Sequence, residues 1–138
     1  MEYILDSSVI IKWYSHHNED WRQNALALLD LYKEGDVSLY VPDLALYEIS
    51  NALRYNKNLS SSEARKSLEY FFALDIAIVS ITEHLLKAAL DIAYNDSITV
   101  YDAVFISVSD YMKIPLVTAN PTRHFPEKHR NIILLRDL

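Results

Sequence analysis

Short apolar runs alternate with longer amphipathic segments along this chain, and this alternation limits the possible folds more than any other feature. Residues 2–5 and 37–41 are short and apolar, and a segment with helical spacing follows each of them. Parallel strands need a long crossover between them, and a helix supplies one. The sequence therefore predicts an α/β fold, a three-layer α/β/α sandwich with a central parallel sheet, as one domain over residues 1–138.

The longer segments carry the start and stop signals of helices. Ala25, Leu28 and Tyr32 recur at helical spacing and precede Gly35, which suits a left-handed C-terminal cap. A run of serines followed by Glu63 indicates a capped N-terminus. The predicted helices cover residues 20–34, 43–57, 59–74, 82–94 and 97–113, and further short strands are predicted within residues 114–120 and 131–138. The helix at 97–113 is apolar on nearly all sides, which predicts that it lies in the core.

The composition excludes several classes of site. The chain has no cysteine, so a thiolate zinc site, a disulfide framework and a cysteine nucleophile are all absent. Its one glycine excludes glycine-rich phosphate loops. A net charge of -6 disfavours a simple electrostatic grip on nucleic acid, unless cations are recruited locally. We expect a cytoplasmic protein with no membrane association, because no apolar run is long enough to span a bilayer and no secretory signal is visible.

Oxygen-bearing side chains follow the predicted strands where those strands end. Asp6 and Asn120 come directly after apolar runs, and Asp102 lies near the start of the helix that leads into the Asn120 strand. Ligands of open parallel sheets gather at the carboxyl ends of the strands. Glu48 falls within the apolar stripe of its predicted helix, with Asn51 close by, so this carboxylate needs a partner. Hard oxygen ligands of this kind suit Mg²⁺ or Mn²⁺.

Four stretches, in this order and spacing, resemble the motifs of PIN-domain nucleases, most closely the VapC-type toxins of toxin–antitoxin pairs. They are "YILDSSVIIKW", "LALYEISNAL", "SITVYDAVFISVS" and "PLVTAN". The resemblance implies a Mg²⁺- or Mn²⁺-dependent endoribonuclease that hydrolyses RNA, with Asp6, Glu48 and Asp102 as metal ligands. It also implies supporting roles for Ser8 and Thr118. A small antitoxin that inserts a basic side chain among the carboxylates, and a homodimer, are implied by the family alone.

One position departs from the family pattern. The last motif usually offers a fourth Asp, where this chain has Asn120, which can still coordinate through its amide oxygen but brings no charge. We therefore expect weaker binding of any second metal ion, since affinity for hard cations follows ligand charge. The alternative is a catalytically impaired PIN fold that only binds RNA or a protein. An acid-lined phosphatase is a remoter alternative, because such enzymes want a second Asp where Ser8 stands.

Each candidate also has a purely structural interpretation. Asp6 could cap the helix that follows it, and Asp102 could be a first-turn acid after a Thr99 cap. Glu48 could pair with a cation such as Arg54, and Asn120 could serve only a turn. Two cations are further candidates for binding substrate phosphates: Lys12, whose stem could instead cover the core, and Arg123, in a basic stretch that could instead be a solvated loop.

Overall fold

The computed structural model describes residues 1–15, 20–120 and 131–138, and within them five parallel strands form one sheet. The strand order is β3-β2-β1-β4-β5, so the first strand of the chain lies at the centre. The strands are β1 (Glu2–Leu5), β2 (Ser38–Pro42), β3 (Ala77–Val79), β4 (Leu116–Thr118) and β5 (Ile132–Leu134). The predicted α/β class with a central parallel sheet is confirmed.

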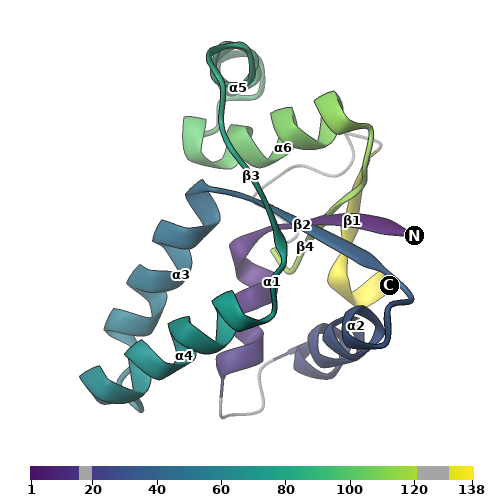
Figure 1. Cartoon of the computed structure of the whole chain (residues 1–138). Coiled ribbons are helices and arrows are strands. Elements are labelled where there is room, and N and C mark those ends of the chain that lie inside the picture. The colour runs from purple at the N-terminus through teal and green to yellow at the C-terminus, as the bar shows by residue number, and fades with distance from the viewer. Residues whose placement is uncertain (16–19, 121–130) are drawn as a thin grey trace.

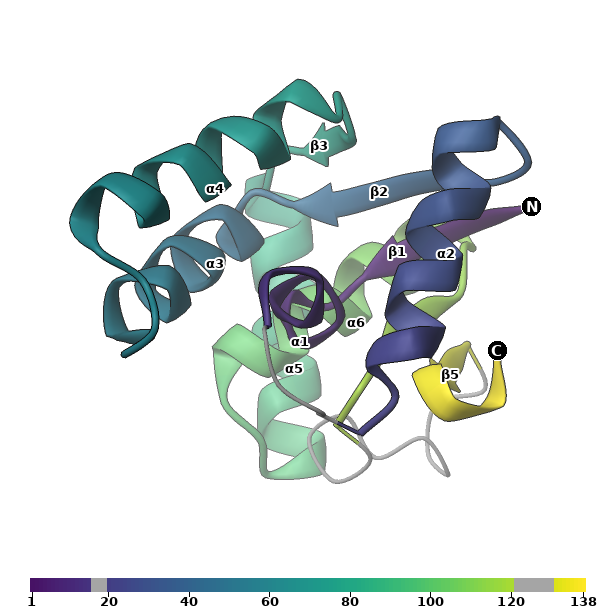
Figure 2. The ribbon, with the colours of Figure 1, turned by 90° about the horizontal axis from the view of Figure 1, so that it is seen from below.

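Helices cover both faces of the sheet and make the three layers visible in Figure 1. The helix α5 and the helix α6 lie on one side, and the remaining helices lie on the other. Figure 2 shows α1 end-on between α2 and α3. The helices are α1 (Ser7–Ile11), α2 (Arg22–Glu34), α3 (Leu44–Tyr55), α4 (Ser61–Ala73), α5 (Glu83–Asp96) and α6 (Val100–Met112), with 3₁₀ turns η1 (Lys12–Tyr14) and η2 (Leu135–Asp137).

The local end signals of the helices act as the sequence predicts. Gly35 adopts a φ of 83° and ends α2 in the left-handed region, and Ser60 with Glu63 forms a reciprocal capping box at the start of α4. Thr99 accepts a hydrogen bond from the backbone N–H of Asp102. These bonds form between residues three or four apart, so the sequence alone specifies them.

The core confirms the central place of β1 and of α6. Ile4 and Leu5 have no exposed surface, and in α6 every residue from Ala103 to Ser109 is buried. A helix buried on all sides fits its position between the sheet and α5. No helix in the described part of the chain is long and apolar enough to cross a membrane.

Two features of the sheet differ from the sequence prediction. The sequence does not predict strand β3, because this strand has only three residues and lies at the edge of the sheet with most of its surface exposed. The pattern predicts one strand for the final segment, but β5 ends at Leu134 and the η2 turn follows. Short edge strands lack the buried apolar run that marks a strand in a sequence.

Candidate active site

The carboxyl ends of β1 and β4 lie together, and they place Asp6 at the exit of the sheet. The backbone N–H of Asp6 donates to the carbonyl of Val117 at 3.0 Å, which fixes the end of β1 to β4. Strands β1 and β2 run towards the left of Figure 1, where α1 and α3 begin. Asp6 is the N-cap residue of α1, yet its side chain makes no capping hydrogen bond with that helix. The purely structural capping interpretation of Asp6 is therefore wrong.

The carboxylate of Asp6 is fully buried and is held by hydroxyl groups. Its Oδ2 accepts from Thr118 Oγ1 at 2.8 Å and from Ser8 Oγ at 3.0 Å. A buried carboxylate is costly unless donors satisfy it, and two short bonds to one oxygen reduce that cost. The hydroxyls thus fix both the position and the rotamer of Asp6.

Both hydroxyls also accept bonds from the chain that leaves β4. Ser8 Oγ accepts from the N–H of Ala119 at 3.1 Å, and Thr118 Oγ1 accepts from the N–H of Asn120 at 3.1 Å. Each hydroxyl therefore passes a hydrogen bond from the backbone to Asp6. The exit of β4 and the start of α1 are joined through these side chains at the site.

Ser7 links Asp6 to Glu48. Its Oγ lies 2.8 Å from Glu48 Oε1 and 3.3 Å from Asp6 Oδ1. A serine hydroxyl has one proton, and the shorter contact makes the better bond, so Ser7 donates to Glu48. Glu48 is half-buried on α3, which packs against α1. Two carboxylates that lie 42 positions apart in the sequence thus contact the same hydroxyl.

Asp102 lies on the first turn of α6 and is half-buried. Its backbone N–H is capped by Thr99, as the structural interpretation of this residue predicted. Within residues 1–15, 20–120 and 131–138, no three His, Asp or Glu side chains lie close enough together to hold a metal ion. The structure therefore links Asp6 with Glu48 through Ser7, and within the described residues these two do not form a three-carboxylate group with Asp102.

The remaining predicted site residues divide into those near Asp6 and those elsewhere. Asn120 is half-buried and follows Thr118 at the exit of β4, whereas Asn51 is exposed on α3 and its side chain makes no hydrogen bond with a described residue. Lys12 begins η1, and its Nζ lies 6.0 Å from the ring centroid of Trp21. Arg123 lies outside the described residues.

The sequence does not predict three residues of this region: Ser7, Trp21 and Arg136. The pair of serines after Asp6 gives a signal for Ser7, but the choice between the two depends on which one faces Glu48. Trp21 lies near η1 and η2, with Lys12 Nζ 6.0 Å and the guanidinium of Arg136 5.9 Å from its ring centroid. No local pattern connects residues so far apart in sequence.

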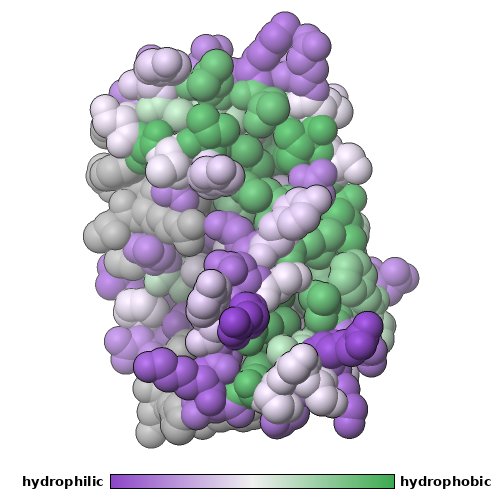
Figure 3. Space-filling model, turned by 90° about the vertical axis from the view of Figure 1, so that its left-hand side faces the viewer, coloured by the Kyte–Doolittle hydropathy of each residue, from purple (hydrophilic) through white to green (hydrophobic). Residues whose placement is uncertain are grey.

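Figure 3 views the molecule from the left of Figure 1, the side where α3 and α6 begin. Hydrophilic side chains run along the middle of this face, with hydrophobic ones above and beside them. Asp6 itself is fully buried and contributes nothing to this surface.

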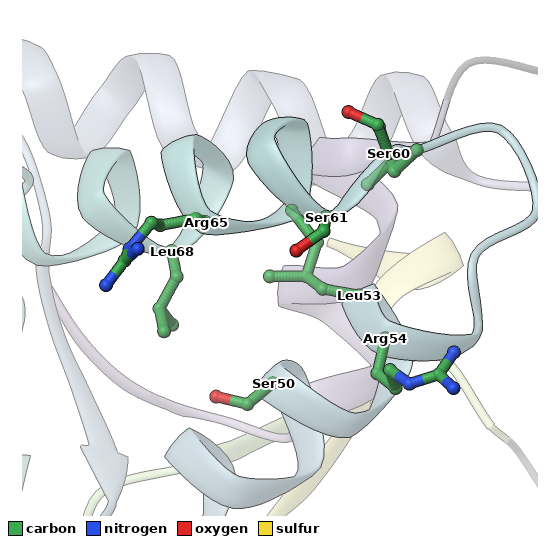
Figure 4. A pocket seen from close by; sticks show the side chains of 9 residues that line it. Ser50, Leu53, Arg54, Ser60, Ser61, Arg65 and Leu68 are labelled. Carbon is green, nitrogen blue, oxygen red and sulfur yellow. The ribbon is translucent and has the colours of Figure 1, made fainter.

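A separate groove of about 390 Å³ lies between α3 and α4. Figure 4 shows Arg54 and Arg65 on its two walls with leucine side chains between them. Neither Asp6, Glu48 nor Asp102 lines it. The groove is therefore separate from the candidate active site.

A family model described as the PIN domain matches residues 3–128. Among curated proteins, none matches the sequence. Solved structures with the same fold include VapBC2 from Rickettsia felis bound to a promoter DNA fragment, with 19% identity, a TM-score of 0.70 and 97% of each chain covered. A toxin–antitoxin complex from Klebsiella pneumoniae is 11% identical, with a TM-score of 0.73 and 99% of each chain covered. DNA-bound VapBC from Salmonella typhimurium is 14% identical, with a TM-score of 0.67, and the match covers 97% of this chain and 96% of that one.

Proposed function

This chain belongs to the PIN-domain family, whose members are generally nucleases, and on that premise we propose that it is a divalent-metal-dependent endoribonuclease, the toxin of a toxin–antitoxin pair. One observation carries the proposal. Asp6 and Glu48 come from different elements and contact the same hydroxyl at the carboxyl end of the sheet, where ligands of such folds bind. Two carboxylates that lie close together repel each other, and a purely structural role does not explain why they meet at this place.

The chemistry of the donors fits Mg²⁺ or Mn²⁺, although Asp102 is not gathered with the other two carboxylates. Carboxylate and amide oxygens from Asp6, Glu48, Asp102 and Asn120 are the ligands that hard cations prefer. Carboxylates brought to ligand distance repel one another unless a cation lies between them. A bound cation would lower the pKa of a water molecule and offset the charge that develops on the phosphodiester oxygens.

The residues of the chain contribute fixed positions to this chemistry. Thr118 and Ser8 hold the Asp6 carboxylate by short bonds, so that carboxylate does not need to reorganise when a cation binds. Ser7 sets the direction of one oxygen of Glu48, and Glu48 would bind a cation or orient the attacking water. Asp102 completes the set from the first turn of α6.

Asn120 favours a weaker site than four acids would make. An amide oxygen coordinates a cation but does not neutralise it, so we expect activity to need a higher metal concentration. The alternative is a PIN fold that binds RNA or protein without cutting. Asn120→Asp, compared with wild type, separates the two. In a weak nuclease the restored charge would raise an activity that the wild type already has. In an impaired protein it would create activity, provided that the other ligands are intact.

An antitoxin is the partner that we propose for the groove between α3 and α4. Similar structures are toxin–antitoxin complexes, and the groove combines leucine side chains with Arg54 and Arg65. A segment with apolar and acidic side chains would complement it. A homodimer rests on the resemblance alone, and light scattering of the purified protein would measure it.

The test of the nuclease is cleavage of a labelled mixed-sequence RNA by partner-free protein in Mg²⁺, Mn²⁺ or chelator. Wild type is compared with Asp6→Ala, Asp102→Ala and the control Asp30→Ala, which removes an exposed carboxylate from α2. We expect metal-dependent cleavage that the first two substitutions abolish and the control preserves. Cleavage that persists in chelator, or that survives both substitutions, would contradict the proposal.

Metal binding can be measured without any RNA. We expect Mn²⁺ to raise the melting temperature of the wild type and of Asp30→Ala, because a ligand that binds only the folded state stabilises it. Asp6→Ala should lose this rise. An equal rise in all three proteins would place the bound ion elsewhere.

A further inference from the structure

Beside Asp6, two cations meet at one aromatic ring. Lys12 Nζ lies 6.0 Å and Arg136 Cζ lies 5.9 Å from the centroid of Trp21. The three residues come from η1, from the start of α2 and from η2, so the tertiary structure alone brings them together. Lysine and arginine near an indole are attracted by its π electrons, which holds both charges in place. We call this group the Trp21 cluster.

The Trp21 cluster adjoins the candidate active site through Thr118. Beside the indole lies a gap too small for a water molecule, around which lie Trp21, Thr118, Ala119, Leu134, Leu135 and Arg136. The same Thr118 donates to Asp6 at 2.8 Å. The cluster therefore lies beside the ends of β4 and β5, one residue away from the buried carboxylate.

The backbone of Trp21 adopts an uncommon conformation. Its φ of 61° lies in the left-handed region, which is unfavourable for a bulky residue and persists only where the surroundings hold it. Trp21 is half-buried and packs against the hydrophobic core. In this conformation the two cations lie 6.0 and 5.9 Å from the centroid of its ring.

The charge of the protein makes such a cluster informative. With a net charge of -6, the surface as a whole repels a polyanion. Arg136 is exposed, and no carboxylate of the described residues lies within ion-pair distance of its guanidinium. Lys12 and Arg136 each lie about 6 Å from the same ring centroid, next to an acidic site. They provide positive potential there, although the net charge of the chain is negative.

We propose that Lys12 and Arg136, positioned by Trp21, bind phosphates of the RNA strand beside the scissile bond and so hold the strand against the Asp6 side of the site. The strand's identity as RNA rests on the proposed nuclease function; the phosphate contacts do not. Trp21 is a positioning residue, because its ring attracts the two cations and holds them in place. The cluster compensates for the repulsion between the acidic site and the incoming phosphates.

The test measures binding separately from cleavage. The probe is a fluorescently labelled oligouridine, titrated with protein in chelator at several salt concentrations and followed by fluorescence anisotropy. Lys12→Ala/Arg136→Ala is compared with Lys33→Ala/Lys66→Ala, which removes the same charge from exposed positions on α2 and α4. Lys33 is a matched control because its Nζ also lies near an aromatic ring, that of Tyr70, at 5.7 Å.

We expect the first double variant to bind up to about tenfold more weakly and the control to bind as wild type does. The slope of log affinity against log salt should fall by roughly 0.7 for each phosphate that the variant no longer neutralises. Lys12→Arg/Arg136→Lys keeps both positive charges, so its affinity and its salt slope should match those of the wild type. Trp21→Leu should reduce the affinity and the salt slope while the circular dichroism spectrum stays unchanged. In cleavage assays the effect should appear in KM rather than in kcat.

The outcomes separate this proposal from the proposed function. Weaker binding by the cluster variant alone supports phosphate binding even if no RNA is ever cut. Equal binding by the cluster and control variants overturns it even if the wild type is an active nuclease. A wild type that does not bind the oligouridine at low salt also overturns it.

Discussion

The two sides of the candidate site are built in different ways. On one side, Asp6 is fully buried and takes hydrogen bonds from Thr118 and Ser8, residues far apart in sequence. On the other side, Asp102 is half-buried on the first turn of α6, and its backbone N–H donates to Thr99, the local cap of that helix. The first carboxylate is part of the core, whereas the second belongs to the surface of a helix.

This difference teaches how function and stability are divided. A buried carboxylate beside Glu48 adds repulsion and desolvation to the folded state, and the hydroxyls offset only part of that cost. A half-exposed first-turn carboxylate costs little and gains from the helix dipole. Substitutions that abolish the same activity should therefore change the free energy of unfolding by different amounts, and even with different sign.

Asp6→Asn should give the largest effect. The amide oxygen can accept from Thr118 and Ser8, and the amide N–H can donate to Ser7, which itself donates to Glu48. The network stays satisfied and the buried charge disappears, so we expect a gain of about 2 kcal/mol in the free energy of unfolding in chelator, with cleavage abolished. Urea denaturation followed by circular dichroism measures it, and a loss of stability would mean that the charge itself supports the fold.

Thr118→Val should destabilise the protein by about 1.5 kcal/mol. It removes a donor to Asp6 and the acceptor for the N–H of Asn120 while it keeps the volume of the side chain. Thr118→Ser retains the hydroxyl and is the control. If both variants unfold at the same urea concentration, the hydroxyl does not hold the Asp6 side together.

The Tyr14 hydroxyl is a buried polar group that lacks hydrogen-bond partners in the described part of the chain, in contrast to the buried carboxylate of Asp6. Its hydroxyl is buried and has no hydrogen-bond partner among the described residues. Tyr14→Phe should therefore raise the free energy of unfolding by up to about 1 kcal/mol near neutral pH. A decrease would show that the hydroxyl has a partner that matters.

The same residue predicts a dependence on alkaline pH. Burial raises the pKa of Tyr14 above its usual value, so the unfolded chain loses the phenolic proton first as the pH rises. The contribution of Tyr14 to stability should be constant below about pH 10 and should then decline as the pH rises towards the higher folded-state pKa. Tyr14→Phe should make this decline shallower, and an unchanged pH profile would contradict the assignment.

Asp102→Asn should give the smallest change in stability, a loss of about 0.5 kcal/mol. The substitution keeps the Thr99 cap, which bonds the backbone, and removes the interaction of the carboxylate charge with the helix N-terminus. Cleavage should nevertheless disappear as completely as in Asp6→Asn. A loss of several kcal/mol would mean that Asp102 is as integral to the core as Asp6, and the contrast between the two sides would be wrong.

The sequence by itself determined the elements and their local ends. Periodicity indicates α6 as a buried helix and Gly35 marks the end of α2, because each signal depends on residues within a few positions of one another. The helix α6 begins at Val100 after the Thr99 cap, and not at residue 97 as the pattern predicts. The motif order also gave the PIN family, which the family match over residues 3–128 confirms. The three-residue edge strand β3 gave no such signal, since it buries little surface.

Only the tertiary structure decided which polar groups meet. Thr118 reaches Asp6 across 112 positions and Ser7 reaches Glu48 across 41, while Trp21 lies near both Lys12 and Arg136. Sequence patterns could name the acids, but not that Ser7 faces Glu48 or that Asp102 is not gathered with Asp6 and Glu48. Such contacts depend on the register of strands and the packing of helices, which fix side-chain positions to within a hydrogen-bond length only after the whole chain has folded.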